Sequence, residues 1–220
     1  EQNRTKQNRT EHNRTDQNRS ERTDNLKKIG LIISERHSQS NVNGADVVVY
    51  SSAVQEDNLE IVAARRKQVP VIRRAEMLAE LLKVKPISIA IAGTHGKTST
   101  CSMLGAILTS ADFNPTMVIG GIVNKFQSNT ISGNGDIIVV EADEYDRMFL
   151  GLRPELAVIT NVEYDHPDCY TTALEVRDAF KQFIELLPSD GVLVVSRHEP
   201  VAEHLGDEAS DRGVQVVTYI

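Results

Sequence analysis

The chain has 220 residues, of which 40% are hydrophobic and 25% charged, as in ordinary globular proteins of one or two domains. Its 31 acidic residues outnumber 24 basic ones, and the net charge of −7 argues against a nucleic-acid partner. The sequence shows neither the apolar run of about 18 residues that a membrane span needs nor a signal peptide. With two cysteines, too few for a disulfide framework, we expect a cytoplasmic protein without nucleic-acid or membrane partners.

Residues 1–23 repeat a polar five-residue unit of the type Glu-Gln-Asn-Arg-Thr. The repeat contains no aliphatic or aromatic side chain, so it cannot bury enough apolar surface to offset the entropy lost on ordering. We therefore expect a disordered low-complexity segment. Its Asn-Arg-Thr/Ser triplets fit the N-glycosylation pattern, but nothing in the sequence directs secretion, so we expect no glycan.

From Asp24 onward, short apolar runs alternate with amphipathic stretches, which predicts an α/β fold. Most of the runs are rich in Val and Ile and apolar on both faces, as in a parallel sheet that is covered on both sides. The predicted strands are Leu31–Ile33, Asp46–Tyr50, Ile87–Ile91, Ile137–Val140, Leu156–Ile159, Val192–Val195 and Val214–Val217.

Apolar periodicity predicts two helices in the second half of the chain. The first covers residues 98–111, and its predicted apolar face consists of Met103, Leu104, Ile107, Leu108 and Ala111. The second covers residues 173–187, and its predicted apolar face consists of Leu174, Val176, Phe180, Phe183, Ile184 and Leu187. This second helix opens with Thr172 and Glu175 at capping-box spacing and is expected to stop at Pro188.

A domain boundary is expected near Lys83–Pro86, where a helix ends and the strand at Ile87 begins. The sequence thus predicts a small α/β segment over residues 24–84 and a larger α/β unit over residues 86–220.

The strongest motif is Ala-Gly-Thr-His-Gly-Lys-Thr-Ser over residues 92–99, between a predicted strand and an amphipathic helix. This context is typical of a phosphate-binding loop, whose glycines turn backbone N–H groups toward phosphate oxygens at a helix N-terminus. Lys97 would contact the β- and γ-phosphates, and the Thr98 hydroxyl would bind Mg²⁺. The loop is a short variant, because Ile91 stands where the usual pattern has its first glycine.

The second motif is a buried strand that ends in a carboxylate, Glu141. A Mg²⁺ ion at a phosphate loop needs one or two carboxylates besides phosphate oxygens and water. Side chains at a strand end alternate in direction, so the acids of this segment cannot all face one ion, and Glu141 is the predicted ligand. For Asp143, Glu144 and Asp146, a solvated acidic loop is an equally good interpretation.

The third motif follows the predicted strand Leu156–Ile159 and contains Asn161, Asp165 and His166. Side chains at the carboxyl ends of adjacent parallel strands converge on one crevice. We therefore expect His166 to reach a metal ion or phosphate that the first two motifs hold.

Together these motifs resemble those of the Mur ligases. The matching segments are Gly-Thr-His-Gly-Lys-Thr-Ser at 93–99, Glu-Ala-Asp-Glu at 141–144 and Thr-Asn-Val-Glu-Tyr-Asp-His at 160–166. Further matches lie upstream at 45–53, 56–58 and 70–78, and Gly120-Gly121 also fits. The resemblance covers about residues 21–220. The histidine in the loop and the Glu-Ala-Asp-Glu form point to the family members that act on L-alanine, although a murein tripeptide ligase would suit the acidic motif as well.

The resemblance implies a parallel-sheet P-loop ATPase domain, preceded by a partial Rossmann-like α/β segment that binds a UDP-sugar. It implies that ATP phosphorylates the carboxylate of UDP-N-acetylmuramate and that the amine of L-alanine displaces phosphate, in peptidoglycan precursor synthesis. The implied cofactors are ATP and Mg²⁺. The implied ATP-binding residues are Gly93, Thr94, His95, Gly96, Lys97, Thr98 and Ser99.

The resemblance also implies catalytic roles. Lys97 would stabilise the transferred phosphoryl group. Thr98 and Glu141 would hold one Mg²⁺ ion, and His166 would bind a second. Asn161 and Asp165 would orient that second site.

In the N-terminal segment, His37, Ser51 and Ser52 would line a groove for the uridine nucleotide, and a structural role is an equally good interpretation of each.

A full ligase of this family is longer and has a further C-terminal domain. Its first strand should precede residue 24, where the repeat stands, and the chain stops at Ile220, inside the expected ATPase domain. We therefore expect an incomplete ligase. Two alternatives stay open: a different phosphate-loop ATPase that needs neither UDP-sugar nor His166, and a non-catalytic nucleotide-binding remnant.

Overall fold

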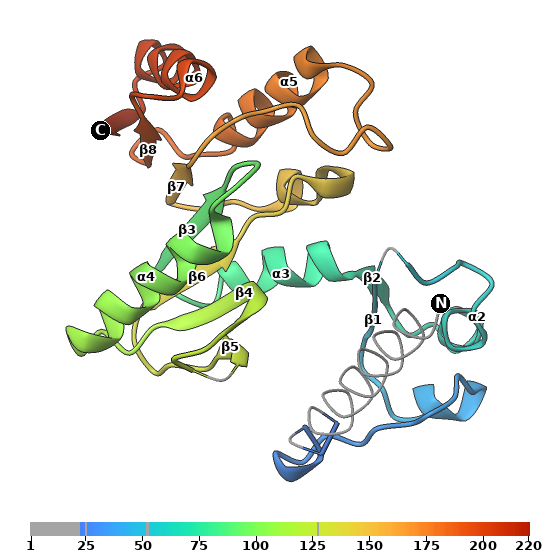
Figure 1. Ribbon diagram of the computed structural model, residues 1–220. Helices are drawn as coiled ribbons and strands as arrows, with labels where there is room; N and C mark the ends of the chain where they lie inside the picture. Colours follow the sequence, from blue (N-terminus) through green and yellow to red (C-terminus); the bar gives the residue numbers. More distant parts are fainter. Residues whose placement is uncertain (1–22, 25, 52, 127) are drawn as a thin grey trace, which may run out of the picture. The chain divides into compact units, whose positions relative to one another are not determined.

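The computed structural model describes residues 23–24, 26–51, 53–126 and 128–220 (Figure 1). The chain divides into two compact units, residues 1–71 and residues 72–220. The segment predicted to be a disordered repeat lies outside the described residues, except for Thr23. None of the described helices is long and apolar enough to cross a membrane.

The smaller unit contains a short 3-10 helix, η1 (Gln39–Val42), strand β1 (Val48–Tyr50) and helix α2 (Leu59–Arg66). Strand β2 (Val71–Arg73) begins at the last residue of this unit and pairs with β1 in a two-stranded sheet. The side chain of Asn58 starts α2 by accepting a hydrogen bond from the Glu60 N–H at 2.9 Å. The predicted strand at Leu31–Ile33 is wrong, because this segment pairs with no described strand and Ile32 is 97% exposed.

The larger unit is built on a seven-stranded sheet in the order β5-β4-β6-β3-β7-β8-β9. Its strands are β3 (Ile87–Ala92), β4 (Thr116–Val123), β5 (Ser128–Ile131), β6 (Ile137–Glu141), β7 (Leu156–Ile159), β8 (Val192–Ser196) and β9 (Gln215–Tyr219). Neighbouring strands run parallel except β4 and β5, which confirms the predicted α/β class with a mainly parallel sheet. The sequence missed β4, because its Gly120-Gly121 pair has low strand propensity, and the mostly polar β5.

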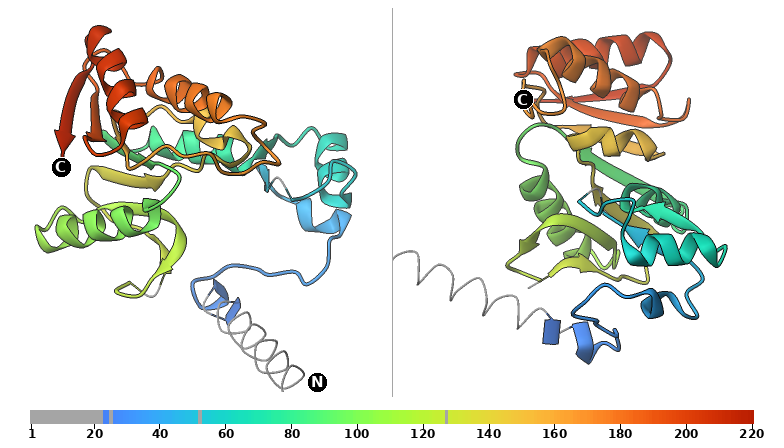
Figure 2. Two further views of the ribbon diagram at one scale, coloured as in Figure 1. Left: turned by 45° about the horizontal axis from the view of Figure 1, so that its top comes forward. Right: turned by 90° about the vertical axis from the view of Figure 1, so that its right-hand side faces the viewer.

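Helices cover both faces of this sheet (Figures 1 and 2). Helix α4 (Lys97–Ser110) packs on one face, where its Cys101 joins a core cluster with Ile89 and Ile91 of β3. The intervening Ala90 and Ala92 belong to the cluster on the opposite face, as the alternation of a strand requires. That opposite cluster packs against α3 (Arg74–Leu82), η2 (Tyr145–Gly151), α5 (Ala173–Ile184) and α6 (Pro200–Asp211).

The first predicted helix forms as α4, but the prediction of its buried face is partly wrong. Met103 and Ile107 are 60% and 65% exposed, whereas Cys101 and Gly105 face the sheet. A Cβ atom at position 105 would collide with the side chain of Met117 on β4. The helix therefore approaches the sheet through its smallest residues, which a search for apolar periodicity does not detect.

The second predicted helix forms as α5 and ends at Ile184, before the predicted stop. Its predicted apolar face is buried except for Leu174, which is 60% exposed. Thr172 caps the helix by accepting a hydrogen bond from the Glu175 N–H at 3.2 Å. The Glu175 carboxylate, in turn, accepts from the N–H of Thr171 and not from that of Thr172.

Candidate active site

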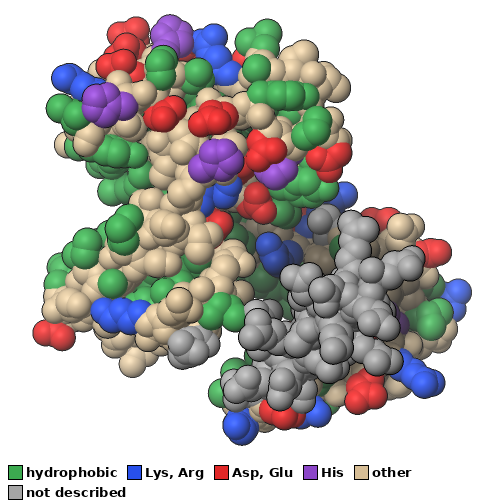
Figure 3. All heavy atoms as spheres, in the orientation of Figure 1, with side chains coloured by type: hydrophobic (Ala, Val, Ile, Leu, Met, Phe, Trp, Pro, Cys, Tyr) green, Lys and Arg blue, Asp and Glu red, His purple; other side chains and the backbone are tan. Residues whose placement is uncertain are grey.

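The three sequence motifs follow strands β3, β6 and β7, which are neighbours in the sheet. Strand β3 lies between the other two and runs parallel to both, so the loops that follow all three strands leave the same edge. Figure 3 shows histidine and acidic side chains gathered with Lys or Arg side chains on this face of the larger unit. The tertiary structure therefore brings the three motifs into one site.

Two glycines shape the phosphate loop. Gly93 and Gly96 have φ angles of 137° and 84°, which residues with a side chain rarely adopt. A Cβ atom at position 93 would also collide with the Thr160 side chain. Gly96 is the N-cap residue of α4, so the left-handed turn leads directly into the helix whose first residue is Lys97.

Residues after β7 hold the phosphate loop in place. Asn161 contacts the His95 backbone twice: its Oδ1 accepts from the N–H at 2.8 Å and its Nδ2 donates to the carbonyl at 3.1 Å. The Thr160 hydroxyl donates to the same carbonyl at 2.6 Å. The Thr94 hydroxyl accepts from the Glu163 N–H at 2.9 Å. The third motif thus fixes the loop, and Asn161 acts on its backbone.

Lys97 lies at the centre of the site, with three acceptors around its Nζ. It donates to the Gly93 carbonyl at 2.6 Å, to the Thr94 carbonyl at 3.4 Å and to Glu144 Oε2 at 2.7 Å. Glu144 is only 1% exposed, so the alternative of a solvated acidic loop is wrong for this residue. Its Oε1 has no hydrogen-bond partner among the described residues and lies 3.5 Å from His166 Nε2.

Thr98 and Glu141 form the second part of the site. The Thr98 hydroxyl lies 3.1 Å and 3.0 Å from the two carboxylate oxygens of Glu141, and the Gly120 N–H donates to Oε2 at 2.8 Å. A Cβ atom at position 120 would come within 3.0 Å of the carboxylate, so the glycine leaves it room. A hydroxyl beside a carboxylate supplies the hard oxygen ligands that Mg²⁺ prefers, and the residues present therefore fit this ion.

His166 stands on a strained backbone, with a φ of 56°. Its N–H donates to Asp165 Oδ1 at 2.7 Å, which holds this conformation. Its ring lies edge-on to the ring of Tyr145, with centroids 5.2 Å apart. The hydrogen bond from Tyr145 to Asp168 raises the pKa of the Tyr145 phenol to about 12, so the hydroxyl stays protonated. Tyr145 is a neighbour of the site that the sequence did not single out.

The other predicted site residues lie apart from these contacts. Ser99 is exposed in the first turn of α4. In the smaller unit, His37 lines an open groove of about 710 Å³, and its Nδ1 lies 2.8 Å from Glu60 Oε2. Ser51 is exposed just after β1, and Ser52 lies outside the described residues.

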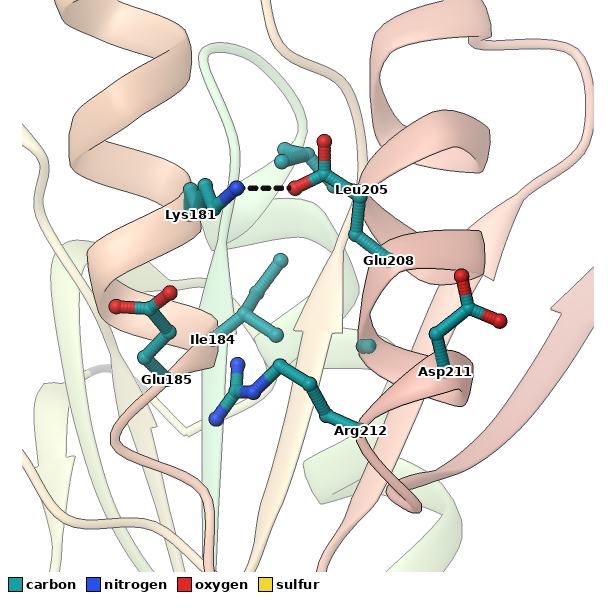
Figure 4. A pocket seen from close by; sticks show the side chains of 8 residues that line it. Lys181, Ile184, Glu185, Leu205, Glu208, Asp211 and Arg212 are labelled. Atoms are coloured by element: carbon teal, nitrogen blue, oxygen red, sulfur yellow. Dashed lines mark ion pairs between the residues drawn. The ribbon is translucent and has the colours of Figure 1, made fainter.

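A second hollow of the larger unit, about 250 Å³ in volume, lies between α5 and α6 and shares no lining residue with the phosphate loop (Figure 4). Lys181 of α5 reaches across it to Glu208 of α6 at 2.8 Å, and Arg177 contacts the same carboxylate at 2.8 Å. The hydrogen bond from Lys181 lowers the pKa of Glu208. The carboxylate is thus already neutralised, and these contacts join the two helices.

Two family descriptions match the chain. Residues 91–220 match the Mur ligase middle domain, and residues 15–86 match the description "Mur ligase family, catalytic domain". The UDP-N-acetylmuramate–L-alanine ligase of Xanthobacter autotrophicus is 48% identical over 194 residues, which are 88% of this chain and 41% of that protein. The protein of the same name from Bradyrhizobium diazoefficiens is 46% identical over 89% of this chain and 41% of its own length. The chain therefore spans about two fifths of these curated relatives.

Solved structures show the same likeness. The UDP-N-acetylmuramate-alanine ligase from Thermotoga maritima has a TM-score of 0.74 at 34% identity, over 85% of this chain and 43% of that one. The UDP-N-acetylmuramate:L-alanyl-γ-D-glutamyl-meso-diaminopimelate ligase from Neisseria meningitides has a TM-score of 0.76 at 25% identity, over 88% and 65%. The two are equally similar to this chain in fold, and the alanine ligase is more similar in sequence.

Proposed function

The chain belongs to the Mur ligase family, and from this premise we propose that it carries the ATP site of a ligase that joins L-alanine to the carboxylate of UDP-N-acetylmuramate. The observation that carries the proposal is that the phosphate loop after β3 meets the carboxylates at the end of β6: Lys97 donates to Glu144 and Thr98 donates to Glu141. The names of relatives at 46–48% identity support the choice of acceptor. The proposal places this step in the cytoplasm, in peptidoglycan precursor synthesis.

In the proposed reaction, the carboxylate of UDP-N-acetylmuramate attacks the γ-phosphoryl group of ATP, and ADP leaves. The amine of L-alanine then attacks the acyl phosphate, and phosphate leaves as the amide forms. Phosphoryl transfer of this kind depends on charge neutralisation and positioning. Lys97 supplies a positive charge at the N-terminus of α4, where the helix dipole also favours phosphate oxygens.

Thr98 and Glu141 are the residues that would hold Mg²⁺, which when bound neutralises charge on phosphate oxygens. Within the chain, the Gly120 N–H keeps the Glu141 carboxylate beside the Thr98 hydroxyl. We propose His166 as the ligand of a second ion near the acyl phosphate, with Asp165 fixing its backbone. The proposed role of Asn161 is to keep the phosphate loop in its binding shape through the His95 backbone.

We also propose that the groove of the smaller unit binds the uridine nucleotide through His37. Ser51 does not line this groove and Ser52 lies outside the described residues, so a uridine contact by either stays a proposal from the family resemblance. The groove is open, and polar side chains such as Ser40 line it together with apolar ones such as Ile32, so it offers both kinds of contact to a nucleotide beside His37.

Calorimetric titration of the chain with Mg²⁺ and a non-hydrolysable ATP analogue tests the proposed site. We expect binding by the wild-type chain and at least a tenfold loss of affinity in Lys97→Ala, because the main positive charge of the loop is gone. Equal affinity of the two proteins would contradict the proposal. Met103→Ala, a change at a 60% exposed residue further along the same helix, serves as the control.

The acceptor is tested by measuring ADP release in the presence of UDP-N-acetylmuramate. Release with L-alanine supports the proposed reaction. Release with L-alanyl-γ-D-glutamyl-meso-diaminopimelate but not with L-alanine would favour a tripeptide ligase, the activity named for the similar Neisseria structure. Nucleotide binding without release in either case would favour a non-catalytic nucleotide-binding module.

A further inference from the structure

The proposed reaction leaves one buried charge at the site without a role, the carboxylate of Glu144. Its side chain is 2% exposed, and that of its partner Lys97 is 12% exposed. The Oε2 to Nζ distance of 2.7 Å makes this a close ion pair that water screens far less than a surface pair. Whatever binds Lys97 must therefore compete with Glu144.

The backbone of the acidic loop is bent in a way that keeps Glu144 beside Lys97. Asp146 and Arg147 have φ angles of 51° and 54°, in the left-handed region that is unfavourable for residues other than glycine. The Glu144 carbonyl accepts from the Arg147 N–H at 3.0 Å and from the hydroxyl of the fully buried Tyr170 at 2.6 Å. Strained backbone persists only where its surroundings determine it strongly, so the position of Glu144 is held by the fold.

A phosphate group that reaches Lys97 has to replace acceptors to which the ammonium group already donates. Lys97 has three N–H donors, and its Nζ has three acceptors, two loop carbonyls and Glu144. Of these three, only Glu144 carries a negative charge that a phosphate oxygen would repel. Glu144 Oε1 accepts no hydrogen bond from the described residues but lies 3.5 Å from His166 Nε2, so the carboxylate has another polar neighbour within reach when Lys97 leaves.

We propose that Glu144 is a positioning residue that holds Lys97 against the phosphate loop until a nucleoside di- or triphosphate binds, and then yields the lysine to its phosphate oxygens. The proposal rests on the nucleotide site proposed above. It has a consequence that a purely structural role does not share: Glu144 lowers the affinity for nucleotides whose β- and γ-phosphates reach Lys97.

The test is the affinity of the full chain for ATP, ADP and AMP, measured calorimetrically in EDTA so that metal ligation plays no part. Glu144→Gln keeps the size of the side chain and removes its charge. We expect Glu144→Gln to bind ATP and ADP about tenfold more tightly than the wild-type chain and to bind AMP, which lacks those phosphates, with unchanged affinity.

The matched control is Asp146→Asn, which removes one negative charge from an exposed residue of the same loop. Asn tolerates the left-handed backbone at this position. We expect the affinity of Asp146→Asn for ATP to stay within about twofold of the wild-type value. A second variant, Glu144→Asp, keeps the charge but draws it back by one methylene. We expect the ATP affinity of Glu144→Asp to lie between those of the wild type and Glu144→Gln. Glu144→Asp becomes the test variant if circular dichroism shows that Glu144→Gln does not fold.

Weaker or unchanged ATP binding by Glu144→Gln would overturn the proposal, as would equal gains for ATP and AMP. If the wild-type chain binds ATP through Lys97 and Glu144→Gln binds no better, the Glu144 proposal alone falls. If neither protein binds ATP, the nucleotide site falls as well. Tight ATP binding by Glu144→Gln alone would support both, with Glu144 as the group that blocks the wild-type site.

Discussion

The two units of the chain differ in how they bury apolar side chains. In the larger unit, Phe149 stacks on Phe183 with centroids 4.8 Å apart and meets Phe180 edge-on at 5.2 Å, and all three rings are fully buried. The buried core cluster of the smaller unit consists of Val42, Ala63 and Ala64, with partly buried valines around it. Since burial of apolar surface is the main favourable term in folding, we expect the larger unit to be more resistant to opening.

This difference matches the division of proposed roles. The residues around Lys97 lie in the larger unit, where a packed sheet fixes their distances. The groove with His37 lies in the smaller unit, whose small core tolerates local opening. The proposed phosphate site therefore belongs to the unit with the larger buried core, and the proposed uridine groove belongs to the unit with the smaller one.

The largest expected effect is that of Phe149→Ala in the core of the larger unit. Removing this ring should cost about 3–5 kcal/mol of unfolding free energy, because it leaves a cavity between η2 and α5. Urea unfolding measures the loss, and hydrogen exchange should locate it in β3, β6 and β7. Phe113→Ala is the matched control, since Phe113 is 54% exposed. A loss below about 1 kcal/mol would contradict the packing argument.

Ile61→Ala makes the corresponding change in the smaller unit. Ile61 is 1% exposed in α2 but lies outside the cluster of Val42, Ala63 and Ala64, so its truncation should cost about 2 kcal/mol, at the low end for such a change. We expect faster hydrogen exchange in α2 and β1 with unchanged exchange in the larger unit. Leu59→Ala, 51% exposed in the same helix, is the control. Equal acceleration in both units would show that they open together and would remove the contrast.

A smaller effect is expected from Glu60→Gln, which tests the pH dependence of the smaller unit. Burial acts to raise the pKa of Glu60, but hydrogen bonds from His37, Asn41 and Ser38 outweigh it and leave the pKa below its ordinary 4.5. A lowered folded-state pKa means that the carboxylate stabilises the fold above pH 4.5 and loses this contribution as the pH falls through the folded-state value.

We expect Glu60→Gln to cost about 0.5 kcal/mol of unfolding free energy at pH 7, because solvent screens these contacts. We also expect the protection of α2 amides against hydrogen exchange to depend less on pH in the acid range than it does in the wild type. Glu80→Gln is the control, since Glu80 and its partner Lys83 are 63% and 60% exposed. If the acid-range pH dependence of this protection is the same in Glu60→Gln and the wild type, Glu60 does not stabilise the smaller unit.

The smallest change uses the cysteines as reporters without altering the fold. Burial raises the pKa of the Cys101 thiol to about 12, so the reactive thiolate is scarce at pH 8. We expect iodoacetamide to alkylate Cys101 at least tenfold more slowly than the half-buried Cys169, as followed by mass spectrometry. Phe149→Ala should speed the labelling of Cys101, and Ile61→Ala should leave it unchanged. Similar rates for both thiols in the wild type would contradict the burial argument.

The sequence predicted the strands whose side chains are apolar on both faces, because burial on both sides of a sheet leaves that local pattern. It also predicted the phosphate loop, whose glycines and lysine have chemical reasons that do not depend on distant residues. It missed β4, where pairing with β6 overrides the low propensity of two glycines, and it misassigned the buried face of α4. In both cases the decisive contact comes from another element.

The position of Glu144 illustrates what the sequence alone does not predict. The sequence was enough to predict a phosphate loop, a strand-end carboxylate and a strand-end histidine, since each prediction depends on the chemistry of adjacent residues. An acidic loop reads the same whether it is solvated or buried. Only the pairing of β3 with β6 places Glu144 on Lys97, 47 positions away, because the environment of a charge is set by its neighbours in space.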